Sequence, residues 1–276
     1  MNTRLRQLDG LRGFLAIAVV VFHLERSLTV SPVVLAYVNL GWAAVPGFFA
    51  LSGYLIARQL DGDMPTAEFW RRRFRRILPL YLLVMAFCAV VFGLGDVPAW
   101  GLPFLPVWSA NGIRCTGEME PLWSITNEAA FYLAAPFLLR RESWAPVWLW
   151  PLLWTGVKVA LTSESMWWGY YCGQWDGFAW GVLAYRLSQE LDTDGAFWRL
   201  ALWGGALVCL APWAGIALGE SGNFLFASTG AGIATAGCVV LAARGRLFDF
   251  EPFEVTGRWS YGLYVWHQPV LLSVLA

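Results

Sequence analysis

Long runs of apolar residues, separated by short polar segments, follow one another along the chain of 276 residues. Each run has about 18 to 25 residues, the length that an α-helix needs to cross a hydrocarbon core of about 30 Å. The nine runs lie near 11–29, 33–57, 77–95, 120–139, 144–162, 167–187, 198–218, 223–243 and 259–276. The pattern predicts an all-α, polytopic transmembrane helix bundle that forms a single domain over residues 1–276, without repeats or long linkers.

The basic residues indicate how these helices are oriented. With the N-terminus in the cytoplasm, 16 of the 19 Lys and Arg residues fall on the cytoplasmic side, and the exceptions are Arg26, Arg114 and Lys158. Basic residues concentrate in the cytoplasmic segments of membrane proteins. We therefore expect a cytoplasmic N-terminus and, with nine helices, a C-terminus on the outside.

The first apolar run has positive charges ahead of it, as a secretory signal peptide does. However, no small-residue cleavage site follows the run, and Glu25 and Arg26 come directly after it. We expect a retained first helix.

The composition agrees with a membrane protein. Hydrophobic residues make up 58% of the chain and charged residues 14%, and there are 18 tryptophans. Soluble domains have about 25% charged residues, and tryptophan is enriched at membrane–water interfaces. The formal net charge is zero, which gives no support to a nucleic-acid partner.

Two of the five cysteines, Cys115 and Cys172, fall in the expected outside loops near 96–119 and 163–175. The oxidising periplasm or cell exterior would allow a disulfide between them. A disulfide and two free thiols both stay open at this point.

Arg12 and His23 are the first pair that points to chemistry. Eleven residues of α-helix turn within about 20° of three full turns and rise about 16 Å. Both side chains therefore share one face of the first helix, with Arg12 at the cytoplasmic mouth. This arrangement suits a long ligand with an anionic part at the mouth and a reactive end deep in the protein. The alternatives are a snorkelling arginine and a histidine that bonds between helices.

A run of five arginines in "FWRRRFRRILPLY", residues 69–81, stands at the cytoplasmic start of another helix. Arg72, Arg73 and Arg76 fall roughly on one side of that helix. Guanidinium groups bind phosphates well, so the run is a candidate phosphate site. The alternative is a topology determinant or a contact with anionic lipids.

Three further ionisable residues lie within apolar helices: Glu128, Asp176 and His267. A carboxylate such as Glu128 in the membrane needs a histidine or arginine partner, or a proton. Structural ion pairing and interhelical hydrogen bonding are the alternatives to a chemical role. The small residues Ser52 and Gly53 in "FFALSGYLI" predict close helix packing.

Five sequence blocks occur together, in order, in this chain and in one known family. They are "LDGLRGFLAIAVVVFH", "FFALSGYLI", "FWRRRFRRILPLY", "LWSITNEAAFYL" and "SYGLYVWHQPV". Through these blocks the chain resembles the acyltransferase-3 family of integral membrane acyltransferases, which includes O-acetylases of bacterial surface polysaccharides. The ten residues between Arg12 and His23 match its signature, and Arg73 and Arg76 ahead of Tyr81 match its cytoplasmic basic motif.

The resemblance implies an enzyme of the bacterial inner membrane. It would move an acyl group, typically acetyl, from cytoplasmic acyl-CoA to a hydroxyl of a carbohydrate or lipid-linked glycan. Relatives usually have one helix more than the nine found here and continue beyond "HQPV". We therefore expect a bundle of nine or ten helices in a short or truncated member.

Together the residues and the resemblance give a mechanistic hypothesis. Arg72, Arg73 and Arg76, with Tyr81, would hold CoA, and His23 would act as general base, with Glu128 orienting it and Arg12 at the mouth. An acyl-enzyme route through His23, Tyr264 or Ser260 is the alternative to direct transfer. His267 and Asp176 are secondary candidates.

Two other classes compete with this hypothesis. Buried Arg, His and Glu could serve a multi-pass transporter or flippase as a proton relay, although no paired repeat halves are visible. A catalytically inactive membrane scaffold is the third class. No metal site is expected, because two distant histidines do not form one.

Overall fold

The computed structural model describes residues 6–24, 31–91, 122–139, 147–166, 169 and 173–275. The chain divides into two compact units. The first consists of Met1–Arg58 and Ala145–Ser260, and the second of Gln59–Trp144 and Tyr261–Ala276. The single domain expected over residues 1–276 stays a prediction. Cys115 and Cys172, for which the sequence leaves a disulfide and two free thiols open, lie outside the described residues.

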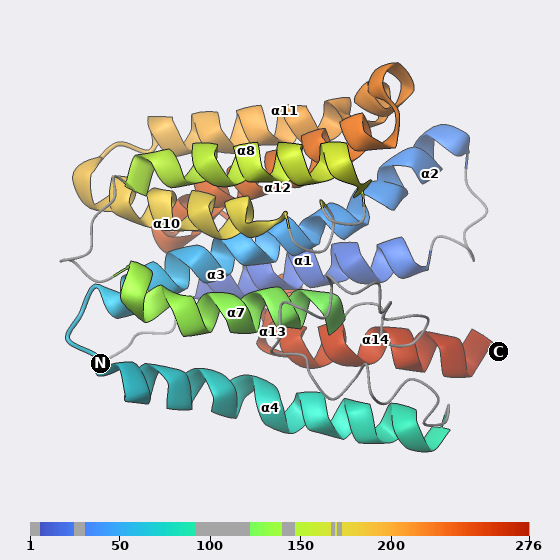
Figure 1. Cartoon of the computed structure of the whole chain (residues 1–276), viewed down its shortest axis with the longest axis horizontal. Coiled ribbons are helices and arrows are strands. Elements are labelled where there is room, and N and C mark those ends of the chain that lie inside the picture. The colour runs from blue at the N-terminus through green and yellow to red at the C-terminus, as the bar shows by residue number, and fades with distance from the viewer. Residues whose placement is uncertain are drawn as a thin grey trace. The chain divides into compact units, whose positions relative to one another are not determined.

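All regular structure in the described residues is helical, which confirms the predicted all-α class (Figure 1). The elements are α1 (Arg6–His23), α2 (Pro32–Val38), η2 (Asn39–Ala43), α3 (Ala44–Leu60), α4 (Thr66–Val91), α7 (Trp123–Leu138), η4 (Val147–Leu149), α8 (Trp150–Glu164), α10 (Trp175–Glu190), α11 (Gly195–Leu218), α12 (Glu220–Ala243), α13 (Glu251–Arg258) and α14 (Ser260–Leu275). The second unit contains α4, α7 and all of α14 except its first residue, together with the last two residues of α3. The other elements belong to the first unit.

Each of the nine apolar runs contains a helix, but the lengths differ from the prediction. Within the described residues, three stretches are long and apolar enough to cross a membrane by length and composition: Pro32–Leu60, Gly195–Leu218 and Glu220–Ala243. By contrast, α7, α10 and α14 have 16 residues each and α8 has 15. Sixteen residues of α-helix measure about 24 Å, less than a hydrocarbon core of about 30 Å.

Two local features differ from the sequence prediction. The run near 33–57 is divided into α2, the 3-10 helix η2 and α3, and α2 begins with Pro32 behind the N-cap residue Ser31. The short helix α13 was not predicted, because its eight residues are too polar and too few to register as an apolar run.

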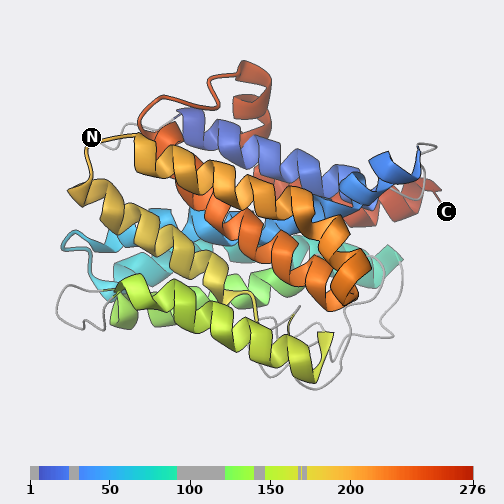
Figure 2. The ribbon, with the colours of Figure 1, turned by 90° about the horizontal axis from the view of Figure 1, so that it is seen from above.

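Within the first unit, α11 and α12 form a helical hairpin and lie side by side (Figure 2). Gly219 connects them with a φ of +75°, a backbone conformation that only glycine adopts readily. Along the hairpin, a Cβ on Gly204 would overlap the backbone nitrogen of Ala234 and lie 2.6 Å from the carbonyl oxygen of Gly230. Small residues therefore let these two helices approach closely.

The prediction of close packing at Gly53 is also confirmed in the first unit. A Cβ added at Gly53 of α3 would overlap the carbonyl oxygen of Phe178 on α10. Next to it, the rings of Phe49 and Phe178 stack with their centroids 4.5 Å apart. The small residue therefore sets the contact between α3 and α10.

The second unit holds α4 against α7 and α14 by polar contacts as well as by packing. The indole Nε1 of Trp70 on α4 donates to the carbonyl oxygen of Tyr132 on α7 at 3.0 Å. The hydroxyl of Tyr261 on α14 donates to the carbonyl oxygen of Ile77 on α4 at 2.9 Å. Such bonds are valuable in lipid, where apolar packing alone gives little driving force for helix association.

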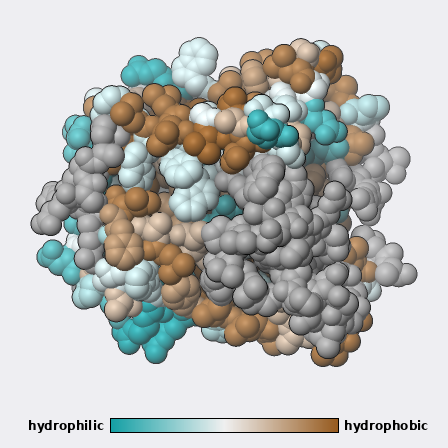
Figure 3. Space-filling model, in the orientation of Figure 1, coloured by the Kyte–Doolittle hydropathy of each residue, from teal (hydrophilic) through white to brown (hydrophobic). Residues whose placement is uncertain are grey.

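Large apolar side chains are exposed on the outer faces of α8 and α11, and brown surface covers this region in the upper part of Figure 3. They include Leu152, Leu153, Trp203, Leu210, Trp213 and Ile216. Soluble monomers rarely expose so large an apolar surface. These faces are suited to contact lipid, as the prediction of a membrane bundle requires.

Candidate functional site

Arg12 and His23 both lie on α1, which runs from Arg6 to His23 without a break. The helix expected from their spacing is therefore present. Nη1 of Arg12 donates to Oδ1 of Asp9 at 2.8 Å, and 18% of the Arg12 side chain is exposed against 4% for Asp9. The ring of His23 lies 4.8 Å from that of Phe22, centroid to centroid. Arg12 is thus held by a carboxylate one turn earlier, which sequence reasoning did not predict.

Helix α13 packs against the N-terminal half of α1. Gly257 packs directly against the backbone of Asp9, so the helices touch where Asp9 holds Arg12. Nε of Arg6 donates to Oε2 of the buried Glu254 at 2.8 Å. This hydrogen bond raises the pKa of Arg6. The unpredicted helix α13 therefore supports the turn of α1 that carries Arg12.

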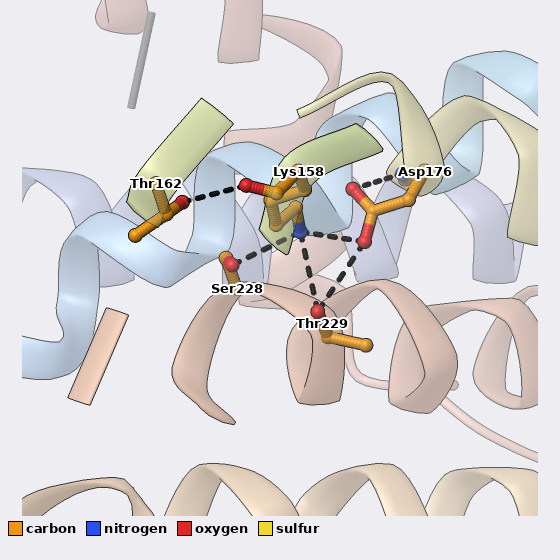
Figure 4. A network of polar contacts seen from close by, with 6 residues as sticks. Lys158, Thr162, Asp176, Ser228 and Thr229 are labelled. Carbon is orange, nitrogen blue, oxygen red and sulfur yellow. Dashed lines mark hydrogen bonds and ion pairs between the residues drawn. The ribbon is translucent and has the colours of Figure 1, made fainter. Parts of the chain in front are cut away.

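Asp176, a secondary candidate, belongs to a buried polar network of α8, α10 and α12 (Figure 4). Oδ2 of Asp176 lies 2.5 Å from Nζ of Lys158, whose side chain has no exposed surface. Lys158 also donates to the hydroxyls of Ser228 at 3.0 Å and Thr229 at 3.3 Å. The Thr229 hydroxyl and the amide of Gly177 donate to the Asp176 carboxylate. The network neutralises Asp176 inside an apolar bundle.

The remaining candidate of the first unit is Ser260, the first residue of α14, which is 5% exposed. It is buried at the position where α14 begins.

In the second unit, the predicted basic run occupies the first turns of α4, and its arginines have different surroundings. The exposed Arg71 and Arg72 donate through Nε to Glu68, at 2.7 and 2.6 Å. The hydrogen bond from Arg72, with a smaller contribution from Arg71, lowers the pKa of Glu68. Arg76 is exposed, and among the described residues no hydrogen bond or ion pair engages it.

Arg73 is enclosed by aromatic rings instead. Its guanidinium carbon lies 5.4 Å from the ring centroids of both Phe69 and Tyr132. Its Nη2 donates to Oε1 of Gln59. Tyr81, also predicted to bind the donor, lies two turns further along α4 and is 2% exposed.

Glu128 lies on α7 among polar residues at helical spacing. The hydroxyl of Tyr132, one turn later, donates to Oε1 of Glu128. Ser124, one turn earlier, is bonded through its Oγ to the hydroxyl of Tyr264 on α14 at 2.6 Å. Ser124, Glu128 and Tyr132 therefore form a polar stripe along α7.

Of the two remaining candidates on α14, Tyr264 contacts this stripe and His267 contacts Tyr264. Tyr264 contacts Ser124 as described, and the carbonyl oxygen of Tyr264 lies 2.7 Å from Nδ1 of His267. His267 is 5% exposed. The hydrogen bond within its own helix fixes the orientation of the His267 ring.

The candidates thus fall into two groups. Arg12, His23, Asp176 and Ser260 belong to the first unit; Glu128, Tyr264, His267, Tyr81 and the arginines Arg72, Arg73 and Arg76 belong to the second. The pairing of Glu128 with His23 joins residues of different units and stays a prediction.

Besides Asp9, sequence reasoning missed three residues. Lys158 appeared only as an exception to the charge rule, although a lysine inside an apolar run predicts a buried partner. Ser124 and Tyr132 lie four residues before and after Glu128, a spacing that places them beside it on a helix. Across the described part of the chain, no group of three His, Cys, Asp or Glu residues could hold a metal ion.

Comparison with known proteins gives the chain relatives over nearly its full length. The peptidoglycan O-acetyltransferase OatA of Listeria monocytogenes is 24% identical over 96% of this chain and 49% of that protein. The putative peptidoglycan O-acetyltransferase YrhL of Bacillus subtilis is 26% identical over 96% of this chain and 48% of its own. The acyltransferase MdmB of Streptomyces mycarofaciens is 32% identical over 52% of this chain and 41% of its own. The chain spans about half the length of these curated relatives.

No solved structure matches the chain. Residues 5–274, however, match the family model described as an acyltransferase domain. The chain therefore belongs to the acyltransferase-3 family, as its five sequence blocks indicated.

Proposed function

We propose that this chain is an O-acetyltransferase of the bacterial inner membrane, which moves an acetyl group from cytoplasmic acetyl-CoA to a carbohydrate hydroxyl. The observation that carries the proposal is the family match over residues 5–274, within which one unbroken helix holds both Arg12 and His23. The peptidoglycan O-acetyltransferases among the relatives support acetyl as the group and a peptidoglycan-type glycan as the acceptor.

The donor is proposed to bind at the basic start of α4. Arg76 is exposed and makes no hydrogen bond or ion pair within the described residues, and Arg72 is exposed beside Glu68. Guanidinium groups in this position can take up the phosphates of CoA by bidentate hydrogen bonds. The pantetheine arm would carry the thioester from there into the membrane.

His23 is proposed as the general base for direct transfer. The acceptor oxygen attacks the thioester carbonyl while His23 accepts the hydroxyl proton, and His23 then gives this proton to the departing CoA sulfur. An imidazole can both accept and donate a proton, as these two steps require. Arg12, held by Asp9 at 2.8 Å, would line the cytoplasmic mouth of the path that the donor follows along α1.

Donor binding is tested by calorimetry of acetyl-CoA with the purified full chain in detergent. Loss of one charge-assisted phosphate contact costs about 1.5–3 kcal/mol, so Arg76→Ala should weaken binding about 10- to 100-fold. Arg199→Ala is the matched control, because Arg199 is an exposed arginine at the start of α11 in the first unit. No saturable binding by folded wild-type protein would reject acetyl-CoA and restore the transporter alternative.

Turnover is tested with radiolabelled acetyl-CoA and a soluble peptidoglycan fragment, with the acetyl ester detected by mass spectrometry. His23→Ala should abolish transfer and leave the Kd for acetyl-CoA within about threefold, since a general base acts on the hydroxyl and not on the phosphates. Equal loss of binding and transfer would make His23 a structural residue.

A further inference from the structure

Arg73 differs from the other arginines of α4 in what surrounds it. Its guanidinium lies against two rings at once, with 5.4 Å to each centroid. Those rings are buried, with Phe69 at 0% and Tyr132 at 2% exposure. The Nε of Arg73 is covered as well and has no hydrogen-bond acceptor among the described residues. This part of the guanidinium is therefore turned toward the protein interior.

The contact ties α4 to α7 at Tyr132. Arg73 covers its ring by a cation–π contact. Trp70, three residues before Arg73, holds the backbone of the same residue through its hydrogen bond to the Tyr132 carbonyl oxygen at 3.0 Å. Gln59 accepts a hydrogen bond from Arg73 and thereby fixes the guanidinium. Tyr132 is thus restrained at its ring and at its backbone.

The restrained tyrosine in turn holds Glu128. Its hydroxyl donates to Oε1 of Glu128 one turn earlier on α7. A chain of contacts therefore runs from the basic end of α4 to the carboxylate: Arg73, the Tyr132 ring, the Tyr132 hydroxyl, Glu128. Arg72 and Arg76 contact neither ring in the described structure and are exposed.

We propose that Arg73 is a positioning residue that sets the orientation of the Glu128 carboxylate through Tyr132, and is not a ligand of the donor phosphates. The inference rests on the proposed acetyl transfer for its effect on rate. The two arginines of the basic motif then have different roles: Arg76 binds the donor, and Arg73 orients the Glu128 carboxylate.

The first test separates binding from turnover, with acetyl-CoA and a soluble peptidoglycan fragment. Arg73→Gln and Tyr132→Phe should each lower kcat at least tenfold and change the KM for acetyl-CoA less than threefold. Arg76→Ala should instead raise the KM for acetyl-CoA and leave kcat nearly unchanged. Because Arg73 and Tyr132 act in one chain of contacts, the double variant should be no slower than the slower single variant. Arg73→Lys should recover part of kcat, since an ammonium keeps the cation–π contact.

The second test needs no turnover. An apolar carbodiimide should label Glu128 slowly in the wild type, where the Tyr132 hydroxyl covers a carboxyl oxygen. Arg73→Gln and Tyr132→Phe should accelerate labelling of Glu128 to the same extent, Arg76→Ala should not, and Glu128→Gln marks the background. Size-exclusion chromatography shows which variants are folded, and Tyr132→Phe carries the labelling test if Arg73→Gln is not folded.

The two tests distinguish the possible failures. If Arg73→Gln weakens acetyl-CoA as much as Arg76→Ala and leaves kcat and Glu128 labelling unchanged, Arg73 is a donor ligand and the inference is wrong. Wild-type protein that transfers no acetyl group, but whose Glu128 labelling responds to Arg73→Gln as described, would reject the proposed function and keep the positioning role.

Discussion

The ammonium group of Lys158 uses all three of its hydrogens, on Asp176, Ser228 and Thr229. No donor of this group is left over for a ligand. An ion pair in a low-dielectric interior is tolerated only when its hydrogen bonds are completed in this way. We interpret the network as a joint between α8, α10 and α12, and a chemical role for Asp176 stays a prediction.

This joint gives a prediction for single residues. Lys158→Met leaves the Asp176 charge buried, so it should destabilise the protein by about 3–5 kcal/mol. The double variant Lys158→Met/Asp176→Asn removes both charges and should recover most of that loss. The measurement is thermal unfolding in detergent, followed by tryptophan fluorescence. Losses that simply add in the double variant would show that the two side chains are not coupled.

At the scale of elements, α8 is attached to the bundle by few side chains. Its buried residues are Pro151, Lys158 and Thr162, while Leu152, Leu153 and Val159 are exposed. The helix therefore depends on a polar joint, unlike the hairpin of α11 and α12, where small residues give close contact. Two ways of joining helices in lipid occur in one unit.

The hairpin offers a matched pair of neighbouring glycines. Gly204→Ala would drive a methyl group into the backbone of α12 and should cost about 1–3 kcal/mol. Gly205→Ala meets nothing within 4 Å and should be neutral or stabilising by up to about 1 kcal/mol, since alanine favours helix. Thermal unfolding of the two variants decides the point. Equal effects would mean that α11 and α12 pack less closely than described.

At the scale of the whole molecule, the distribution of arginines predicts the side of the membrane on which each loop lies. In a cysteine-free chain, a cysteine at the exposed Glu220 should react with an impermeant maleimide on intact cells. A cysteine at the exposed Asp63 should react only after permeabilisation. The reverse pattern would invert the topology and place the arginine run outside.

The sequence predicted the helical class and the approximate position of each long helix in the described part of the chain, because an apolar run of sufficient length has few other solutions in a membrane protein. It did not predict α13, which is short and amphipathic and is held by contacts with α1 at Gly13 and Asp9. Helix boundaries and breaks, as in α2 and η2, depend on local capping and packing, which an apolar run does not encode.

For the candidate site, the sequence identified the ionisable residues but not their partners, and the chemical roles of these residues stay predictions. Arg12, Glu128 and Asp176 each have a described partner, in Asp9, Tyr132 and Lys158. Asp9 and Tyr132 lie within one turn on the same helix and could have been found from spacing. The pair of Lys158 and Asp176 joins two helices, and no spacing rule reports such a contact.

The buried lysine also constrains how the protein is made. Lys158 emerges from the ribosome before Asp176 and well before Ser228 and Thr229, its other two partners. A lone lysine at the centre of a nascent helix costs about 2.5–3.5 kcal/mol to insert through the translocon. We therefore expect α8 to wait at the translocon for α10 and to enter the bilayer with it as a pair, with α12 completing the joint later in synthesis.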